Sequence, residues 1–377
     1  MIFITLDGAR FDRLSNSKVI KELAKKGSCF TNVITYSPYT IGAMHAIFSG
    51  EYGFRTGVNS YWSTYRFKHD RYKTLTEYFH DAGYKTYGDS INELVLPKQG
   101  FDELKYHDED KDDLIVRHVK LINKMKSLVQ QNQKFFLYLH YSNIHTNIKH
   151  AVLKPYNNFS EEYFKNRNIN EKKYDEYFEC AENYLKNIMK QINKNGLEKN
   201  SMVVIVSDHG ISVGEKFGER AYGAFCYDYT IRTFGLFIKE GIFPIKKIDI
   251  QTRSIDFLPT ILQACNISQD ENYEKISGKT LQRIIEGKDT IRSAITETGN
   301  PQKSNRPPKE PNIVSIRKEG WKLILNLFDK SQELYNLHND PNEEHNLIND
   351  NNINEERLFD ELMDLYPNLR EKWMKKI

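Results

Sequence analysis

A chain of 377 residues can bury one large core, alone or beside a smaller companion domain. Its 54 Lys and Arg residues nearly balance its 51 Asp and Glu residues, giving a formal net charge of +3. No basic run stands alone, so a nucleic-acid polymer is not the expected partner. No run approaches the roughly 18–20 apolar residues of a membrane helix, so no membrane span is expected.

The beginning of the chain and its cysteines bear on the compartment. No segment with the pattern of a signal peptide precedes the first strand-like run, which starts at Ile2. The cysteines lack the spacing of a metal site or a disulfide framework and suit free thiols in a reducing environment: Cys29, Cys180, Cys226 and Cys265. We therefore expect a cytoplasmic protein, whose oligomeric state the sequence does not indicate.

Short apolar runs alternate with helical patterns through the first three quarters of the chain. The runs typical of buried strands cover 2–6, 84–88, 134–141, 202–207 and 233–238. The helical patterns lie near 17–26, 40–49, 73–82, 111–131, 172–194 and 254–265. This alternation predicts an α/β domain over 1–290, with a central, mostly parallel sheet and helices on both faces.

The pattern changes from about residue 291. Short strand-like runs separated by turn-prone segments predict a small antiparallel sheet over 293–298, 312–317, 321–326 and 333–337, and a helix near 353–375 closes the chain. We expect a C-terminal subdomain over 291–377, packed on the same rim as the functional site. Loops are predicted at 59–73, 146–170 and 300–312, and they would determine the choice of substrate.

Polar residues that can bind metals follow three of the predicted strands. Asp7 follows 2–6, Asn143 and His145 follow 134–141, and Asp208 with His209 follows 202–207. In a sheet of this kind, ligands bind beyond the carboxyl ends of the strands. The two aspartates and His209 would make an oxygen-rich site for a divalent cation. Each residue alone also has an ordinary structural interpretation, as a cap or a packed side chain.

Thr40, at the start of the 40–49 helical pattern, has two interpretations. Threonine is a common N-cap, which is the simpler explanation. A helix N-terminus also binds anions, and a metal-bound hydroxyl loses its proton more readily than a free one. Thr40 is therefore a candidate fourth metal ligand and a candidate nucleophile.

Seven segments, in order along nearly the whole chain, resemble one family. LDGARFDRL (6–14) resembles the opening Asp-x-x-Arg-x-Asp motif of the sulfatase branch of the alkaline phosphatase superfamily. TIGAMHAIFSGEYGFRTG (40–57) is similar to its nucleophile helix, and VSDHGISVGEKFG (206–218) to its Ser-Asp-His-Gly hallmark. The other matching segments are LTEYFHDAGYKT with GFDE, FFLYLHYSNIH, IDFLPTIL with ISGKTL, and SIRKEGWKLILN with ELYNLHNDPNEEHNL.

The resemblance implies an alkaline-phosphatase-like α/β sandwich and assigns roles to the rim residues. Asp7, Asp208 and His209 become metal ligands, and Thr40 becomes a ligand and nucleophile that also caps its helix. The residues that relatives use for a second metal are largely missing. We therefore expect one divalent ion, which could be Mn, Zn, Mg or Ca.

The chain departs from the sulfatase pattern at the nucleophile. Sulfatases carry Cys or Ser there, which is converted to formylglycine, whereas Thr40 cannot give that aldehyde. This difference favours a phosphodiester or phosphonate monoester hydrolase, or a phosphotransferase, acting on a small anionic ester whose leaving group could be sugar- or lipid-linked. The alternatives are sulfate-ester hydrolysis without formylglycine and a non-catalytic binding protein on the same fold.

Further residues receive predicted roles around this centre. His145 is the candidate general acid, with a purely structural histidine as the alternative. We predict substrate contacts from Asn92 and Asn143. Lys216 and Arg220 could stand in for the second cation as fixed positive charges, or be ordinary surface charges. Scaffold roles are predicted for Arg10, Asp12, Arg55 and His45.

Overall fold

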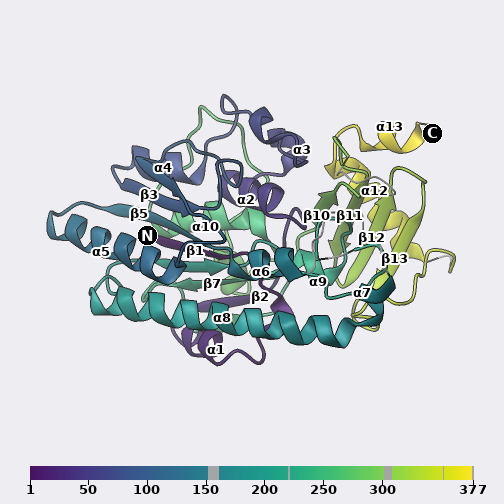
Figure 1. Cartoon of the computed structure of the whole chain (residues 1–377). Helices are drawn as coiled ribbons and strands as arrows, with labels where there is room; N and C mark the ends of the chain where they lie inside the picture. Colours follow the sequence, from purple (N-terminus) through teal and green to yellow (C-terminus); the bar gives the residue numbers. More distant parts are fainter. Residues whose placement is uncertain (152–160, 220, 301–307, 351, 376–377) are drawn as a thin grey trace.

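The computed structural model describes residues 1–151, 161–219, 221–300, 308–350 and 352–375. Two β-sheets organise these residues, a large one near the N-terminus and a small one near the C-terminus (Figure 1). No helix in the described ranges has both the length and the apolar character needed to cross a membrane.

The large sheet is mixed but mostly parallel. Its strands are β1 (Ile2–Leu6), β2 (Ser28–Ile34), β3 (Lys85–Ser90), β4 (Glu103–Tyr106), β5 (Phe135–Tyr141), β6 (Val203–Val206), β7 (Arg232–Ile238), β8 (Lys246–Ile248) and β9 (Thr252–Arg253). Their order is β4-β3-β5-β1-β6-β7-β2-β8, and β9 pairs with β2. β7 runs antiparallel to both of its neighbours, whereas β1 lies parallel to β5 and β6. The predicted α/β architecture is confirmed.

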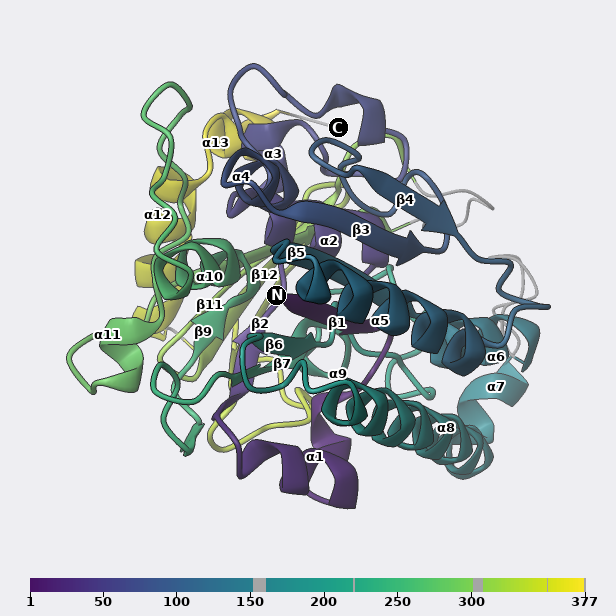
Figure 2. The same ribbon diagram turned by 90° about the vertical axis from the view of Figure 1, so that its left-hand side faces the viewer.

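Helices cover both faces of this sheet (Figure 2). One face packs against α1 (Lys18–Ala24), α5 (Leu114–Gln130) and α8 (Arg167–Lys194), and the other against α2 (Thr40–Ser49), α4 (Leu75–Asp81) and α10 (Phe257–Ala264). Strand β1 explains why both faces need covering: Ile2, Ile4 and Leu6 lie in the first apolar core, and Phe3 lies in the second. Burial of such side chains is the main force that joins the layers.

The small sheet is antiparallel, as predicted. It contains β10 (Ala294–Thr298), β11 (Ile313–Lys318), β12 (Trp321–Asn326) and β13 (Gln332–Asn336), in that order. It contacts the segment before α2, because Thr296 Oγ1 donates to the Thr35 carbonyl (2.6 Å) and the Glu297 amide donates to the Tyr36 carbonyl (3.0 Å). The division of the chain at 290/291 stays a prediction.

The predicted helix 353–375 is two helices, which corrects the sequence analysis. α12 (Ile353–Leu365) and α13 (Leu369–Met374) are separated at Pro367. Proline cannot continue a helix, and Asn368 takes a left-handed conformation with φ of 64°. The remaining helices are η1 (Phe11–Arg13), α3 (Gly53–Thr56), η2 (Thr64–Arg66), α6 (Asn143–Ala151), α7 (Glu161–Lys165), α9 (Asp228–Ile231), η3 (Ser254–Asp256) and α11 (Gln282–Ile285).

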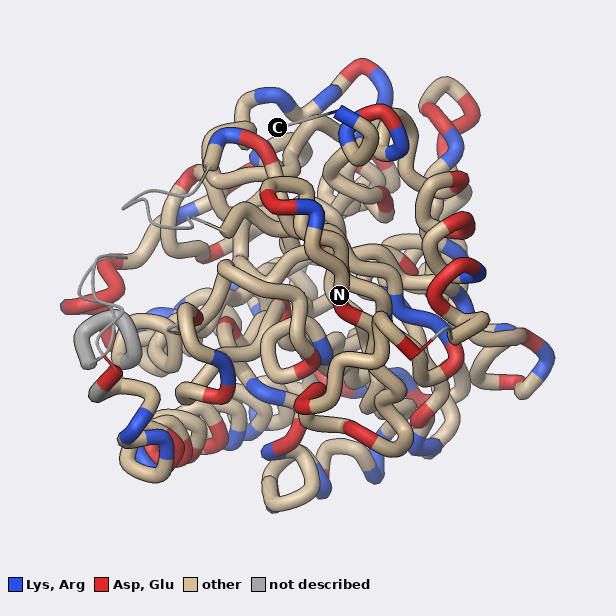
Figure 3. Tube along the Cα trace, turned by 90° about the vertical axis from the view of Figure 1, so that its right-hand side faces the viewer, with Lys and Arg blue, Asp and Glu red and all other residues tan. Residues whose placement is uncertain are grey.

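Charged residues of both signs mix along the surface. On the side of the molecule drawn in Figure 3, Lys and Arg positions alternate with Asp and Glu positions over the described chain. This mixture matches the small formal net charge of +3. On that side, the described residues form no broad patch of one sign that would attract a polyanion by charge alone.

Candidate active site

Four of the predicted site residues meet at the carboxyl ends of neighbouring strands. Asp7 follows β1, and Asp208 and His209 follow β6, which is the parallel neighbour of β1. Thr40 begins α2 and retains 8% of its surface exposed, while the other three are fully buried. The fold therefore gathers these residues from three segments that are far apart in the sequence.

The ligand-type atoms of these residues converge on one point. His209 Nε2 lies 3.2 Å from Thr40 Oγ1, 3.4 Å from Asp7 Oδ1 and 3.6 Å from Asp208 Oδ2. Thr40 Oγ1 lies 3.3 Å from Asp7 Oδ2. Asp7 Oδ1 and Asp208 Oδ2 have no hydrogen-bond partner among the described residues although both are buried. Such oxygens are costly unless a cation binds them, so the donor set fits a divalent metal ion.

Backbone groups fix the orientation of these ligands. The amides of Gly8 and His209 donate to Asp208 Oδ1, at 3.2 and 2.9 Å. His209 Nδ1 donates to the Gly210 carbonyl (2.8 Å), so the lone pair of Nε2 faces the cluster. Gly8 adopts φ of +75°, and a Cβ there would lie 2.5 Å from Ile211 Cδ1. A glycine is therefore required directly after Asp7.

The two buried carboxyl groups have different pKa shifts. Burial opposes the ionisation of Asp7, but the charge of His145 and the hydrogen bond from His140 hold its pKa below the usual range. Burial raises the pKa of Asp208, and the neighbouring charge of Asp7 adds to the effect. Two carboxylates this close disfavour each other's ionisation, and a shared cation would relieve that repulsion.

Thr40 is not the cap of its helix, which corrects the sequence analysis. The N-cap of α2 is Tyr39, and no side chain caps the helix. Thr40 occupies the first helical position, where backbone amides have no partner within the helix. Its hydroxyl is thus not engaged in capping and faces Asp7 and His209 instead.

His140 is a site residue that the sequence analysis missed. The register of β1 and β5 pairs Thr5 with His140, which places this histidine beside the end of β1. His140 Nε2 donates to Asp7 Oδ2 (3.1 Å), and Nδ1 accepts from the Tyr138 hydroxyl (2.6 Å). A histidine within the otherwise apolar and aromatic run FFLYLHY was the available signal, because a buried imidazole needs specific partners.

His145 lies on the first turn of α6, held on both ring nitrogens. Nδ1 lies 3.2 Å from Glu109 Oε1, and Nε2 hydrogen-bonds to the Tyr222 hydroxyl. The Tyr222 ring also packs against His209, with 4.7 Å between ring centroids, so it bridges His145 and the ligand cluster. Burial opposes the charged form of His145, but the carboxylates of Asp7 and Glu109 raise its pKa.

Comparison with known proteins identifies the family. The sulfatase family model matches residues 1–267, and the model of the N-sulphoglucosamine sulphohydrolase C-terminal region matches residues 223–371. This chain belongs to the sulfatase family. A curated sulfatase from Formosa agariphila is 25% identical over 179 residues, which cover 46% of this chain but only 31% of that protein.

Solved structures share the fold of this sulfatase-family chain at low identity. BT4656, in complex with its substrate D-glucosamine-2-N,6-O-disulfate, is 15% identical with a TM-score of 0.71, covering 99% of this chain and 97% of that one. The 2-O GAG sulfatase BT1596 is 17% identical with a TM-score of 0.77, covering 98% and 93%. The phosphonate monoester hydrolase of Agrobacterium radiobacter is 14% identical with a TM-score of 0.72, covering 98% and 94%.

The remaining predicted site residues of this sulfatase-family chain lie in different places. Asn143 begins α6 and is partly buried. Asn92 is exposed, and its side chain accepts from the Leu94 amide (2.9 Å). Lys216 binds the Glu343 carbonyl, and its Nζ lies 5.7 Å from the ring centroid of Tyr335 on β13, so it contacts the small sheet. Arg220 lies outside the described residues.

A buried ion pair supports the loops that carry the ligands. Arg10 contacts Asp12 (2.8 Å) and Glu215 (2.5 Å), and it donates to the Ile211 carbonyl (2.7 Å). It thus ties the loop after β1 to the loop after β6. His45 contacts the Leu94 carbonyl (3.2 Å), and burial lowers its pKa to about 4. These contacts agree with the scaffold roles predicted for Arg10, Asp12 and His45.

Proposed function

We propose that this chain is a metal-dependent phosphoester hydrolase or phosphotransferase, of the phosphodiester or phosphonate monoester type, with Thr40 as its covalent nucleophile. The position of Thr40 carries the proposal. Its hydroxyl lies within 3.3 Å of both Asp7 and His209, at the N-terminus of a ten-residue helix. A threonine there cannot be converted to the formylglycine that sulfatases use, but it can attack phosphorus directly.

The proposed cofactor is one divalent cation. Asp7, Thr40, Asp208 and His209 would hold it, and the unpartnered oxygens of both aspartates support this assignment. When bound, such a cation lowers the pKa of the Thr40 hydroxyl and stabilises negative charge on the ester oxygens. The N-terminus of α2 adds backbone N–H groups that favour the same anionic group.

The first half of the proposed cycle forms a phospho-threonine and releases the leaving group. Thr40 Oγ1 attacks phosphorus and transfers its proton to Asp7 Oδ2, which accepts a hydrogen bond from His140 and holds the proton until Thr40 is released. The P–Oγ1 bond forms, and the bond from phosphorus to the leaving oxygen breaks. The leaving oxygen takes a proton that starts on His145 Nε2 and passes through the bonded Tyr222 hydroxyl.

The second half of the cycle restores the residues. Water attacks the phospho-threonine, or an acceptor hydroxyl does so in a transferase. The P–Oγ1 bond breaks, the attacking oxygen gives its proton to His145 through Tyr222, and Thr40 regains its own proton. Glu109 keeps the imidazole oriented throughout, because it binds Nδ1 in both protonation states.

Sulfate-ester hydrolysis is the second candidate. The family models that match the chain are those of sulfatases, which favours this alternative. It requires Thr40, or a water molecule in its place, to attack sulfur without the formylglycine diol. A phosphoester nucleophile needs no modification of Thr40, and for that reason we favour the phosphoester.

A substrate panel separates these candidates. The metal-stripped protein is supplied in turn with Mn²⁺, Zn²⁺, Mg²⁺ or Ca²⁺ and assayed on p-nitrophenyl phosphate, bis(p-nitrophenyl) phosphate, p-nitrophenyl phenylphosphonate and p-nitrophenyl sulfate. We expect metal-dependent turnover of the diester or the phosphonate. Turnover of the sulfate alone would show that the phosphoester proposal is wrong, and no turnover with any metal would favour a binding protein.

A further inference from the structure

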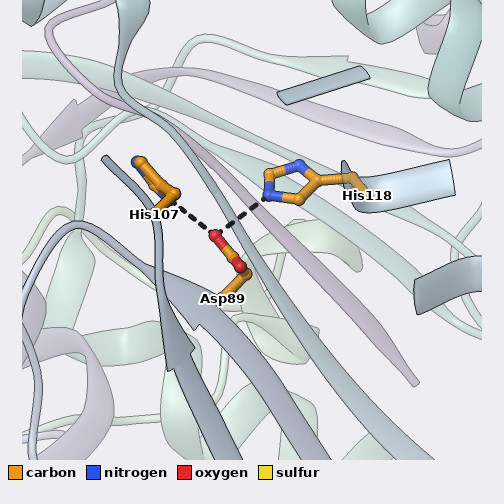
Figure 4. Close-up of side chains that lie close together, drawn as sticks. All are labelled: Asp89, His107 and His118. Carbon is orange, nitrogen blue, oxygen red and sulfur yellow. Dashed lines mark hydrogen bonds and ion pairs between the residues drawn. The ribbon is translucent and has the colours of Figure 1, made fainter. Parts of the chain in front are cut away.

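A second cluster of metal-ligand residues (Figure 4) lies beside the candidate active site, with 6.4 Å between the ring centroids of His107 and His140. Asp89 is on β3, His107 directly follows β4, and His118 is on α5. Their side chains are fully shielded from solvent. None of the three belongs to a motif that the sequence analysis singled out.

The two imidazoles converge on a single carboxylate oxygen. His107 Nδ1 lies 2.5 Å from Asp89 Oδ1, and His118 Nε2 approaches the same oxygen from another direction at 3.4 Å (Figure 4). The ligand atoms of the three residues all lie within 4.8 Å of one another. A cation bound at about 2.0–2.2 Å from each would need only a small opening of this cluster.

Each of the three residues also binds a further partner through its other nitrogen or oxygen atom, as metal ligands commonly do. His107 Nε2 pairs with Ser142 Oγ at 2.9 Å, and His118 Nδ1 pairs with the Tyr184 hydroxyl at 2.6 Å. Asp89 Oδ2 contacts Arg117 Nε, which leaves Oδ1 for the cation. These outer partners fix both rings with the other nitrogen directed at the shared centre.

Charge and access are compatible with an ion at this position. Arg117 also binds Asp112 (3.2 Å), so its positive charge is shared between two carboxylates. A cavity of about 270 Å³ borders the cluster on the side of Asp89 and Arg117.

We propose that Asp89, His107 and His118 bind a zinc ion. Two imidazoles and one carboxylate with a water molecule form a four-coordinate donor set that suits Zn²⁺ better than Mg²⁺ or Ca²⁺, which prefer oxygen ligands. Binding needs no net loss of protons from the imidazoles. The proton on His107 Nδ1 moves to Nε2 and is donated to Ser142, and the proton on His118 Nε2 moves to Nδ1 and is donated to Tyr184.

Such an ion would join β3, the turn after β4 and α5 at one point. That turn also carries Glu109, which binds His145 and Thr146 on the first turn of α6 (3.2 and 2.8 Å). Ser142, the outer partner of His107, precedes the same helix. The site is therefore structural, and it stabilises the segment that orients His145. Its existence does not depend on the chemistry proposed for Thr40.

Zinc counting on matched variants tests this proposal. The full chain is stripped with EDTA, incubated with Zn²⁺, separated from free ion, and its zinc measured by mass spectrometry. The variants are His118→Gln for this site and Asp208→Ala for the candidate active site, with the exposed His80→Ala as control. We expect His118→Gln to lose one equivalent that both Asp208→Ala and His80→Ala retain. Equal zinc in the unaltered protein and His118→Gln would overturn the proposal.

A second measurement needs no variant and covers the case in which His118→Gln does not fold. In crystals of the unaltered protein soaked with Zn²⁺, anomalous scattering at the zinc edge should give a peak between His107 Nδ1 and His118 Nε2. The absence of that peak in crystals saturated with zinc would refute the site. A peak only among Asp7, Asp208 and His209 would refute it as well, while supporting the proposed cofactor of the active site.

Discussion

Buried carboxylates lie both in the candidate active site and where the two sheets meet. The groups that neutralise their negative charge differ between the two places. At the sheet contact, Lys322 lies between Asp228 (2.6 Å) and Glu343 (2.7 Å), and Arg317 also binds Asp228 (3.0 Å). Burial opposes the ionisation of Asp228, but Arg317 and Lys322 hold its pKa low. The protein thus supplies its own cations to these carboxylates.

In the candidate active site, by contrast, no Lys or Arg of the described chain contacts Asp7 or Asp208, and their ion-pair partners are the histidines His140 and His209. An uncompensated buried charge costs several kcal/mol in order of magnitude. The sheet contact thus carries its own positive charge, whereas the candidate active site lacks a Lys or Arg partner, and this difference supports the proposed binding of a cation there. Glu297 is an intermediate case, because its carboxyl group accepts hydrogen bonds from the neutral hydroxyls of Tyr36 and Tyr366.

The largest expected effect tests whether the incomplete site performs chemistry. Thr40→Ala removes the proposed nucleophile, so kcat on the best ester of the panel should fall by about 10³-fold or more. Thr40→Ser should retain part of the activity because it keeps a hydroxyl. The exposed Thr290→Ala is the control and should match the unaltered protein. Full activity in Thr40→Ala would remove Thr40 from the mechanism.

The next largest effect concerns the contact between the two sheets, where Lys322 pairs with Asp228 and Glu343. Lys322→Met leaves Asp228 and Glu343 buried without their shared cation, so the free energy of unfolding should drop by about 3–5 kcal/mol. Urea denaturation measures this change. Lys25→Met, on the surface, should change it by less than about 0.5 kcal/mol. A loss that small in Lys322→Met would mean that the two sites do not differ in the way described.

A substitution of His145 tests its proposed role as the general acid of the candidate active site. Without a proton donor, His145→Gln should slow esters with poor leaving groups by about 10²-fold, because these need protonation as the bond breaks. Esters of p-nitrophenol should be affected much less. Tyr222→Phe should show the same dependence on the leaving group if the proton passes through its hydroxyl. A uniform loss over all leaving groups would instead indicate a structural role for His145.

Glu297 gives the smallest effect, visible in the pH dependence of stability. Burial raises its pKa to about 7, so the folded state keeps a proton that the unfolded chain loses near its usual value of 4.5. Stability from this group is present below pH 4.5 and is lost as pH rises through 7, by about 2 kcal/mol between pH 5 and pH 7. Glu297→Gln should flatten this part of the curve measured by urea denaturation at several pH values. An unchanged slope would contradict the assignment.

Much of the fold follows from pattern in the sequence, and the misses have physical causes. Strand 2–6 and helix 40–49 match β1 and α2 residue for residue, because their apolar side chains are buried almost throughout. Strand β2 was missed because Ser, Thr and Asn interrupt its apolar residues and its register shifts between Phe30 and Val33. Most of α6 and the whole of α7 were assigned to the loop 146–170, because both helices are short, nine and five residues, and rich in polar residues.

In the candidate site, too, some residues could be predicted from local sequence pattern and others could not. Asp7, Thr40, Asp208 and His209 could be predicted because each lies at the end of a recognisable strand or the start of a helix, within family-like motifs. The contact of Lys216 with Tyr335 of the small sheet could not, because it depends on packing between segments distant in the sequence. The same holds for Asp89, His107 and His118, which only the tertiary fold brings together.

The hydrogen bonds from β10 to Thr35 and Tyr36 give the small sheet a part in positioning Thr40. Those two carbonyls belong to the short stretch that ends at Thr40, the proposed nucleophile, so the small C-terminal sheet supports a residue near the beginning of the chain. A shortened version that stops at 290 would keep every proposed ligand and still lack the support that aims the threonine. Any engineered version that is meant to keep the position of Thr40 therefore has to keep the small C-terminal sheet as well.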